Sequence, residues 1–336
     1  MTSATERARW FSYGRQRLNR AGRDPDGVLR DVVAVHSAHP TAPLSLLARC
    51  EPLTADAFRA LDALRLPAMR GTIHLLPRDL AHLAFAATPP AADAEAEALE
   101  QLALSADEYA RLRSGLLAAA REPRTARELR EEVAADRPLA PVLATLTREG
   151  VLVRLGAHGL RSNELFYVAA HVPPADPGEA LAWLAGEYLR AYGPARREDF
   201  AWWAGVPAGR AATALASVET EELGDGLLLR SADVPAFERA AALRDTVDLL
   251  PRWDAYTMGY APDGRGRFAD PDVLGHLYDA GGDGRPVVLV DGSAVGTWGV
   301  RPGGGLELEL ELFEPPSPSV RAVLDERAAA IRALLS

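Results

Sequence analysis

The segment from residue 124 to residue 170 constrains the fold more than any other part of the chain. Thr125 and Glu128 match a capping box, which predicts the start of a helix that runs to a turn at 136–138. Apolar residues at helical spacing over 139–146 predict a second helix, which stops at Gly150. Two short strands, 151–155 and 165–169, then flank a glycine-containing turn. This order of elements is typical of a winged helix, a module that often binds DNA.

The same order recurs on both sides of this segment. Upstream, Asp24 and Pro25 predict the start of a helix over 26–35, and helices over 43–49 and 54–64 and a short hairpin over 66–76 follow. Downstream, helices are expected over 181–188, 197–203 and 207–218, and a hairpin over 223–230. Strands over 287–290, 294–300 and 306–313 and a helix over 319–335 then form a β-rich C-terminal cap on the third unit.

Three similar units predict an α+β fold with three tandem winged-helix modules. The first module is expected over residues 1–120, the second over 121–175, and the third, with its β-rich cap, over 176–336.

Composition excludes several classes of protein. A single cysteine, Cys50, excludes a disulfide framework and a multi-thiolate metal site. The first ten residues are charged and do not resemble a signal peptide, and no apolar run approaches the roughly 18 residues of a membrane span. The chain has no phosphate-binding Gly-Lys loop and no G-x-S-x-G elbow. We expect a cytoplasmic protein without a cofactor or metal, and we expect it to be monomeric.

The charge distribution permits a nucleic-acid partner despite a net charge of −10. Residues 1–30 carry seven arginines against three acidic residues, and residues 111–170 carry ten against seven. Residues 171–336 carry 15 arginines against 26 acidic residues. Binding to phosphates needs a local basic surface and not a basic whole protein. We therefore expect the middle module to make most of the phosphate contacts, and the acidic hairpin of the third module to make few.

Eight residues are candidate contacts to DNA because they lie on or beside these predicted modules. In the middle module, the second helix can enter the major groove while the arginines of the hairpin reach phosphates. The candidates are Arg15, Arg70, His74, Arg127, Arg148, Arg154, Arg161 and Arg252.

Two histidines, His36 and His39, are the candidate catalytic residues. The apolar stripe of the helix expected over 26–35 directs His36 inward, and Pro40 disfavours helix at His39, so both are expected at a helix-to-loop junction. A histidine there can hold a water molecule or accept a proton. A purely structural, hydrogen-bonded histidine is the alternative that the residues leave open.

Four segments carry a resemblance to a known family. They are MRGTIHLLP at 69–77, YGP at 192–194 with EDF and WW at 198–203, LLPRWDAY at 249–256, and GTW at 296–298. In this order they resemble the AlkZ-type winged-helix DNA glycosylases, the azinomycin-resistance family. The resemblance implies three winged helices around a concave face that binds duplex DNA. It also implies the removal of alkylated or bulky-adducted purines, with a role in self-resistance to a genotoxin.

The chain departs from this family at the catalytic motif, which is Gln-x-Gln or Gln-x-Asp. Aligned on Pro40, the first glutamine falls on His36 and the second on Ala38, and His39 follows. His36 can still orient water, whereas Ala38 has no polar group. A non-catalytic winged-helix DNA-binding protein, regulatory or lesion-sensing, is therefore the alternative to a glycosylase.

The absence of lysine indicates the type of glycosylase. All 37 basic residues are arginine. A glycosylase that also cuts the strand forms a Schiff base through an amine, usually that of lysine, and a permanently protonated guanidinium cannot replace it. We therefore expect a monofunctional enzyme that uses water and leaves an abasic site.

Overall fold

The middle part of the chain folds as its capping box predicts. The computed structural model describes residues 4–18, 24–38, 40–89, 99–100, 103–136, 138–156, 159–162, 164–301 and 306–336. The Thr125 hydroxyl accepts a hydrogen bond from the backbone N–H of Glu128, whose carboxylate accepts one from the backbone N–H of Thr125. The elements here are α7 (Ala106–Ala119), β4 (Arg124–Thr125), α8 (Ala126–Glu132), α9 (Ala140–Arg148), β5 (Leu152–Leu155) and β6 (Phe166–Ala169). They enclose an apolar cluster of their own, which includes Leu116, Leu129, Leu146 and Leu152.

The first part of the chain differs from the expectation at the candidate catalytic residue. Its elements are α1 (Ala4–Arg15), α2 (Pro25–Asp31), β1 (Val35–His36), α3 (Thr41–Leu47), α4 (Ala55–Arg59), β2 (Ala63–Pro67), η1 (Met69–Gly71), β3 (Ile73–Pro77) and α5 (Ala81–Ala87). The helix expected over 26–35 ends at Asp31, and the chain turns at Val33, which has a left-handed φ of 72°. The expected catalytic helix of the first module is therefore wrong, because His36 lies on strand β1.

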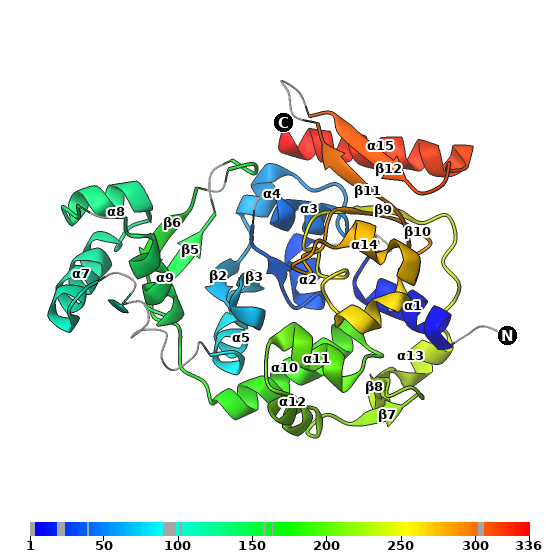
Figure 1. Ribbon diagram of the computed structural model, residues 1–336, viewed down its shortest axis with the longest axis horizontal. Coiled ribbons are helices and arrows are strands. Elements are labelled where there is room, and N and C mark those ends of the chain that lie inside the picture. The colour runs from blue at the N-terminus through cyan, green and yellow to red at the C-terminus, as the bar shows by residue number, and fades with distance from the viewer. Residues whose placement is uncertain are drawn as a thin grey trace.

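A six-stranded sheet joins these two parts. Its strand order is β1-β3-β2-β5-β6-β4, and the joint between β2 and β5 pairs Arg65 with Arg154. Figure 1 shows β2 and β3 between the middle part, on the left, and the rest of the molecule. The helix expected over 54–64 ends at Arg59, because the residues from Ala63 pair as strand β2 with β3.

The next part of the chain forms a helical layer below this sheet in Figure 1. It contains α10 (Pro177–Tyr192), α11 (Arg197–Ala204), α12 (Ala208–Leu215), β7 (Thr220–Glu222), β8 (Leu228–Arg230), η2 (Ser231–Asp233) and α13 (Val234–Glu238). The side chain of Asp176 caps the start of α10 by accepting hydrogen bonds from two backbone N–H groups. Helix α11 ends at Gly205, which adopts the left-handed conformation. Helices α10 and α5 pack together, so the third expected unit rests on the first.

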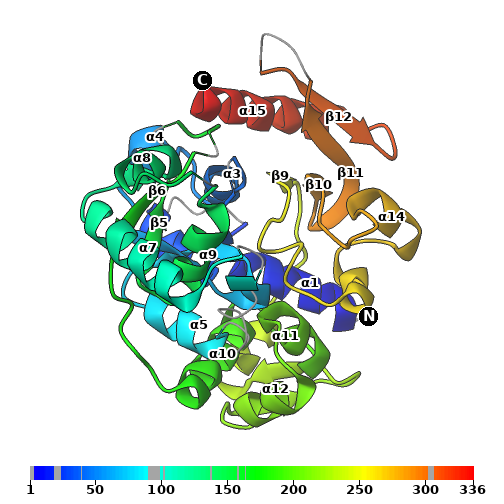
Figure 2. The same cartoon turned by 60° about the vertical axis from the view of Figure 1, so that its left-hand side comes forward.

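The C-terminal part forms a separate antiparallel sheet with strand order β12-β11-β10-β9. Its elements are β9 (Val247–Leu250), η3 (Pro262–Arg267), η4 (Pro271–Val273), α14 (Leu274–Leu277), β10 (Val287–Val290), β11 (Ser293–Val300), β12 (Leu308–Leu312) and α15 (Pro318–Leu335). Figure 2 shows α15 on the opposite side of the molecule from α12. Leu249 and Ile331 share an apolar cluster with Leu46 of α3, so this part packs on the first unit. Leu250 shares another cluster with Leu184 of α10, so this part also packs on the third unit.

No helix among the described residues is long and apolar enough to cross a membrane.

Candidate active site

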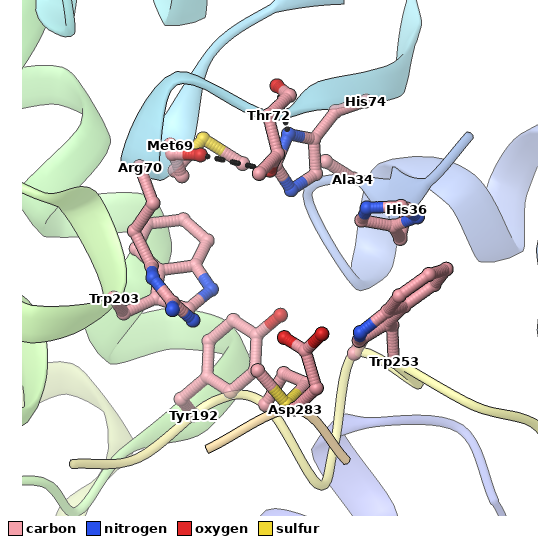
Figure 3. Close-up of a pocket in the computed structure, with 12 residues that line it drawn as sticks. Ala34, His36, Met69, Arg70, Thr72, His74, Tyr192, Trp203, Trp253 and Asp283 are labelled. Carbon is pink, nitrogen blue, oxygen red and sulfur yellow. Dashed lines mark hydrogen bonds between the residues drawn. The ribbon is translucent and has the colours of Figure 1, made fainter. Parts of the chain in front are cut away.

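A cavity of about 200 Å³ lies where the β1–β3 pair, helices α10 and α11, and the loop after β9 meet. Figure 3 shows the side chains that surround it. Three of the segments that carry the family resemblance supply most of the lining, although at least 45 residues separate one from the next along the chain. The cavity is lined by Ala34, His36, Met69, Arg70, Thr72, His74, Tyr192, Trp203, Trp253, Ala255, Met258 and Asp283.

Strand pairing brings two histidines to the same wall of the cavity. His36 of β1 lies directly opposite His74 of β3 in the antiparallel register. Side chains of directly opposed residues lie on the same face of a sheet, which explains why both imidazoles reach the cavity. Their ring centroids are 6.0 Å apart, with an interplanar angle of 70°.

The hydrogen bonds of the two imidazoles assign opposite tautomers. Nδ1 of His74 lies 3.0 Å from the carbonyl oxygen of Thr72, which can only accept, so Nδ1 carries the proton and Nε2 has a free lone pair. Nδ1 of His36 accepts a long bond, 3.4 Å, from the backbone N–H of Ala38, so its proton lies on Nε2. His74 therefore offers an acceptor to the cavity and His36 a donor.

Both imidazoles are neutral at physiological pH. Burial lowers the pKa of His36 to about 4, Arg252 and Arg70 lower it further, and Asp283 opposes them. Burial lowers the pKa of His74 to about 3, with the neighbouring His36 acting in the same direction. The cavity thus holds two uncharged imidazoles beside cationic guanidinium groups.

Trp253 lines the cavity in direct contact with the ring of His36. Its ring centroid lies 4.6 Å from that of His36, and the Arg252 guanidinium lies 4.1 Å from the centre of its ring. Its backbone adopts a left-handed φ of 56°, a conformation that costs a bulky residue roughly 1–3 kcal/mol. The surrounding structure must hold this residue in place, and strain of this kind is concentrated at functional sites.

A buried ion pair holds the loop that carries Trp253. The guanidinium of Arg49 and the carboxylate of Asp254 are fully buried and form two bonds of 2.8 Å. The hydroxyl of Ser45 donates a third bond to the same carboxylate, at 2.8 Å. The pair thus fixes the residue next to Trp253 against the end of α3.

Arg70 approaches the cavity from η1, between β2 and β3. It is exposed, and its guanidinium lies 4.2 Å from the ring centre of Trp202 in α11. This approach requires Gly205, because a Cβ there would lie 2.8 Å from the Cα of Arg70. The local packing therefore directs one cation to the edge of the cavity.

A second cavity, of about 450 Å³, lies on the other side of His36 and extends to the middle part of the chain. Arg148 of α9 and Arg154 of β5 line it together with Ser37 and Ala38. Within the described ranges, neither arginine has a carboxylate partner. Burial lowers the pKa of Arg154, and the positive charge of the nearby Arg148 lowers it further. This arrangement of unpaired cations suits an anionic ligand.

The other predicted contacts to DNA are placed differently. Arg161 is exposed between β5 and β6. Arg127 pairs with Glu131, and Arg15 pairs with Asp233, away from both cavities. Arg252 stacks on Trp253 without itself lining the first cavity, and it pairs with Asp279 and Asp283. His39 lies outside the described residues.

Among the lining residues of the first cavity that sequence reasoning did not single out are three aromatic residues and one acid: Tyr192, Trp203, Trp253 and Asp283. The first three lie in segments that carry the family resemblance, which could have marked them as candidates. Asp283 has no such signal, because it reaches the cavity from a turn before β10.

Comparison with known proteins gives two findings. The family model described as "DNA glycosylase AlkZ-like" matches residues 29–334. Among solved structures, the chain is similar to the Streptomyces sahachiroi DNA glycosylase AlkZ, with a TM-score of 0.73 and 21% sequence identity, over 99% of this chain and 97% of that one. No curated protein matches the sequence.

Proposed function

The chain belongs to the AlkZ-like DNA glycosylase family, and we propose that it hydrolyses the N-glycosidic bond of alkylated or bulky-adducted purines in duplex DNA. The observation that carries this proposal is the cavity between β3, α11 and the loop after β9. Segments from distant parts of the chain meet there around two neutral histidines and several aromatic rings.

The chemistry of the substrate explains why so small a set of polar groups suffices. An N7-alkylated purine already carries a positive charge, so its glycosidic bond is weakened and the base leaves without an acid. The enzyme then has to hold the DNA and direct one water molecule at C1′. Positioning together with a polar group supplies several kcal/mol of the barrier.

We assign His36 to the orientation of this water. It takes the place of the first glutamine of the family motif, and its protonated Nε2 is a donor, as an amide nitrogen would be. Ala38 lines the second cavity and offers no polar side chain, so the second glutamine has no counterpart there. His39 stays a candidate from its position in the sequence.

The DNA-binding surface in this proposal follows the second cavity. Arg148, Arg154 and Arg161 would contact phosphates, and Arg70 and His74 would contact the DNA nearest the lesion. Arg15, Arg127 and Arg252 would have to exchange their carboxylate partners for phosphates, so we expect them to contribute less.

The modular organisation is also part of the proposal. Three winged-helix modules, over residues 1–120, 121–175 and 176–336, would face one duplex as a monomer. The helix–helix–hairpin order of α8, α9, β5 and β6 supports this for the second module, and α11, α12, β7 and β8 support it for the third. By removing genotoxin adducts, such an enzyme would serve self-resistance.

The alternative is a DNA-binding protein that has lost catalysis, and the specific observation that favours it is Ala38. One experiment separates the two. Duplex DNA that carries 7-methylguanine, or a bulky adduct at the same nitrogen, is incubated with the protein, and released base and abasic sites are counted. We expect release with wild-type protein, whereas binding to the damaged duplex without release would leave only the binding function.

A further inference from the structure

The cavity contains a second imidazole, His74, which lies outside the catalytic Gln-x-Gln motif of the family. His74 lies on β3, 38 residues beyond His36, and strand pairing places the two side chains on the same face. In Figure 3 one ring nitrogen of His74 bonds to Thr72, and the other points into the cavity. We propose that His74 is the catalytic base, which takes the proton from the water molecule that attacks C1′.

The tautomers support this division of roles. The carbonyl of Thr72 can only accept, so it holds the proton on Nδ1 of His74 and keeps the lone pair of Nε2 free. Nε2 of His36 carries a proton, because Nδ1 of the same ring already accepts a hydrogen bond from the backbone N–H of Ala38. Of the two imidazoles, only His74 can therefore accept a proton in the arrangement that the structure shows, while His36 orients the same water by donation.

The reaction balances with these groups alone. The bond between C1′ and N9 breaks, and its electron pair neutralises the charge of the alkylated purine. The water oxygen bonds to C1′, and the water proton passes to Nε2 of His74, which later releases it to solvent. The products are an abasic site, the free base and one proton, so no lysine and no general acid are needed. This step rests on the proposed function.

The charged and titratable groups around His74 determine how this base responds to pH. They are His36 on β1, Arg70 on η1, Tyr192 on α10 and Asp283 before β10. Burial keeps the imidazole neutral in the free protein. When DNA is bound, the negative charge of its phosphates favours the protonated imidazole. It therefore raises the pKa of His74 and makes Nε2 a stronger base.

The test is single-turnover excision by His74 variants on a 7-methylguanine duplex. His74→Gln keeps an acceptor but not a base, and His74→Ala removes both. We expect each to slow excision by roughly 100-fold or more, the usual scale for a positioned base. The dissociation constant for the duplex should change by less than about threefold. His276→Gln is the matched control, because His276 is exposed, its ring contacts Phe313, and neither residue lines the cavity.

Two further readouts separate a base from a structural residue. Added imidazole should restore excision by His74→Ala in proportion to its neutral fraction. The wild-type rate should fall as the pH is lowered and Nε2 is protonated, and His74→Gln should lack this dependence. Wild-type rates in both variants, or full activity of His74→Gln, would refute the assignment. If wild-type protein releases no base from any alkylated duplex, the proposed function itself is wrong, which is a distinguishable outcome.

Discussion

The buried ion pair between Arg49 and Asp254 should control both stability and the position of Trp253. Arg49→Met leaves the carboxylate of Asp254 fully buried without its two bonds of 2.8 Å. Breaking one side of such a pair costs about 3–5 kcal/mol in the free energy of unfolding. At roughly 2.1 cal/mol/K of unfolding entropy per residue, 336 residues give about 0.7 kcal/mol/K, so the loss corresponds to a fall in Tm of about 4–7 °C.

Calorimetry of a double-mutant cycle tests this reasoning. The double variant Arg49→Met with Asp254→Leu removes both charges, so it should be less destabilised than Arg49→Met alone. Arg301→Ala is the control, because Arg301 forms an exposed pair with Glu309 that should contribute less than about 1 kcal/mol. If the two single effects simply add in the double variant, or if Arg49→Met melts with the wild type, the pair does not have the role assigned to it.

Two further predictions concern the site. His36→Gln restores the amide of the family motif and should retain most excision activity, whereas His36→Ala should lose roughly 100-fold in rate; equal loss in both variants, measured under single turnover, would mean that donation is not the role of His36. Replacing Arg148 and Arg154 by alanine should weaken duplex binding and flatten its salt dependence by up to about one unit of slope per lost contact. An unchanged slope would place the DNA-binding surface elsewhere. Arg127→Ala is the control and should weaken binding less, because Arg127 is paired with Glu131.

Local signals predicted much of the secondary structure. The capping box at Thr125 gives α8, and the cap at Asp24 gives the start of α2. Alternating leucine and glutamate before residue 313 gives β12, which runs over Leu308–Leu312. Each of these features is set by residues close together in the sequence, so reading the sequence alone was enough.

The errors in the predicted structure occur where contacts between residues far apart in the sequence determine the local conformation. The surroundings of His36 were predicted as a helix end, but pairing with β3, nearly 40 residues later, makes it a strand. The same pairing makes His74 a partner of His36, whereas sequence reasoning treated it only as a contact to DNA. Strand β9 was missed because all four of its residues are buried, Asp248 included, so no alternation of exposed and buried positions marks it.

The candidate site was predicted only in part for the same reason. The resemblance to the family marked segments of the chain but not their convergence on one cavity. That convergence depends on packing between α10, α11 and the loop after β9, and on the buried bonds of Asp254. Asp283 and the strained backbone of Trp253 are visible only in three dimensions.

The most direct test of the account is borohydride trapping during excision. Wild-type protein is incubated with a 7-methylguanine duplex with and without borohydride, and abasic sites and covalent protein–DNA adducts are measured in the same samples. A lysine-free enzyme that uses water should produce abasic sites and no adduct. An adduct at the level of base release, mapped anywhere but to the N-terminal amine, would contradict the water mechanism.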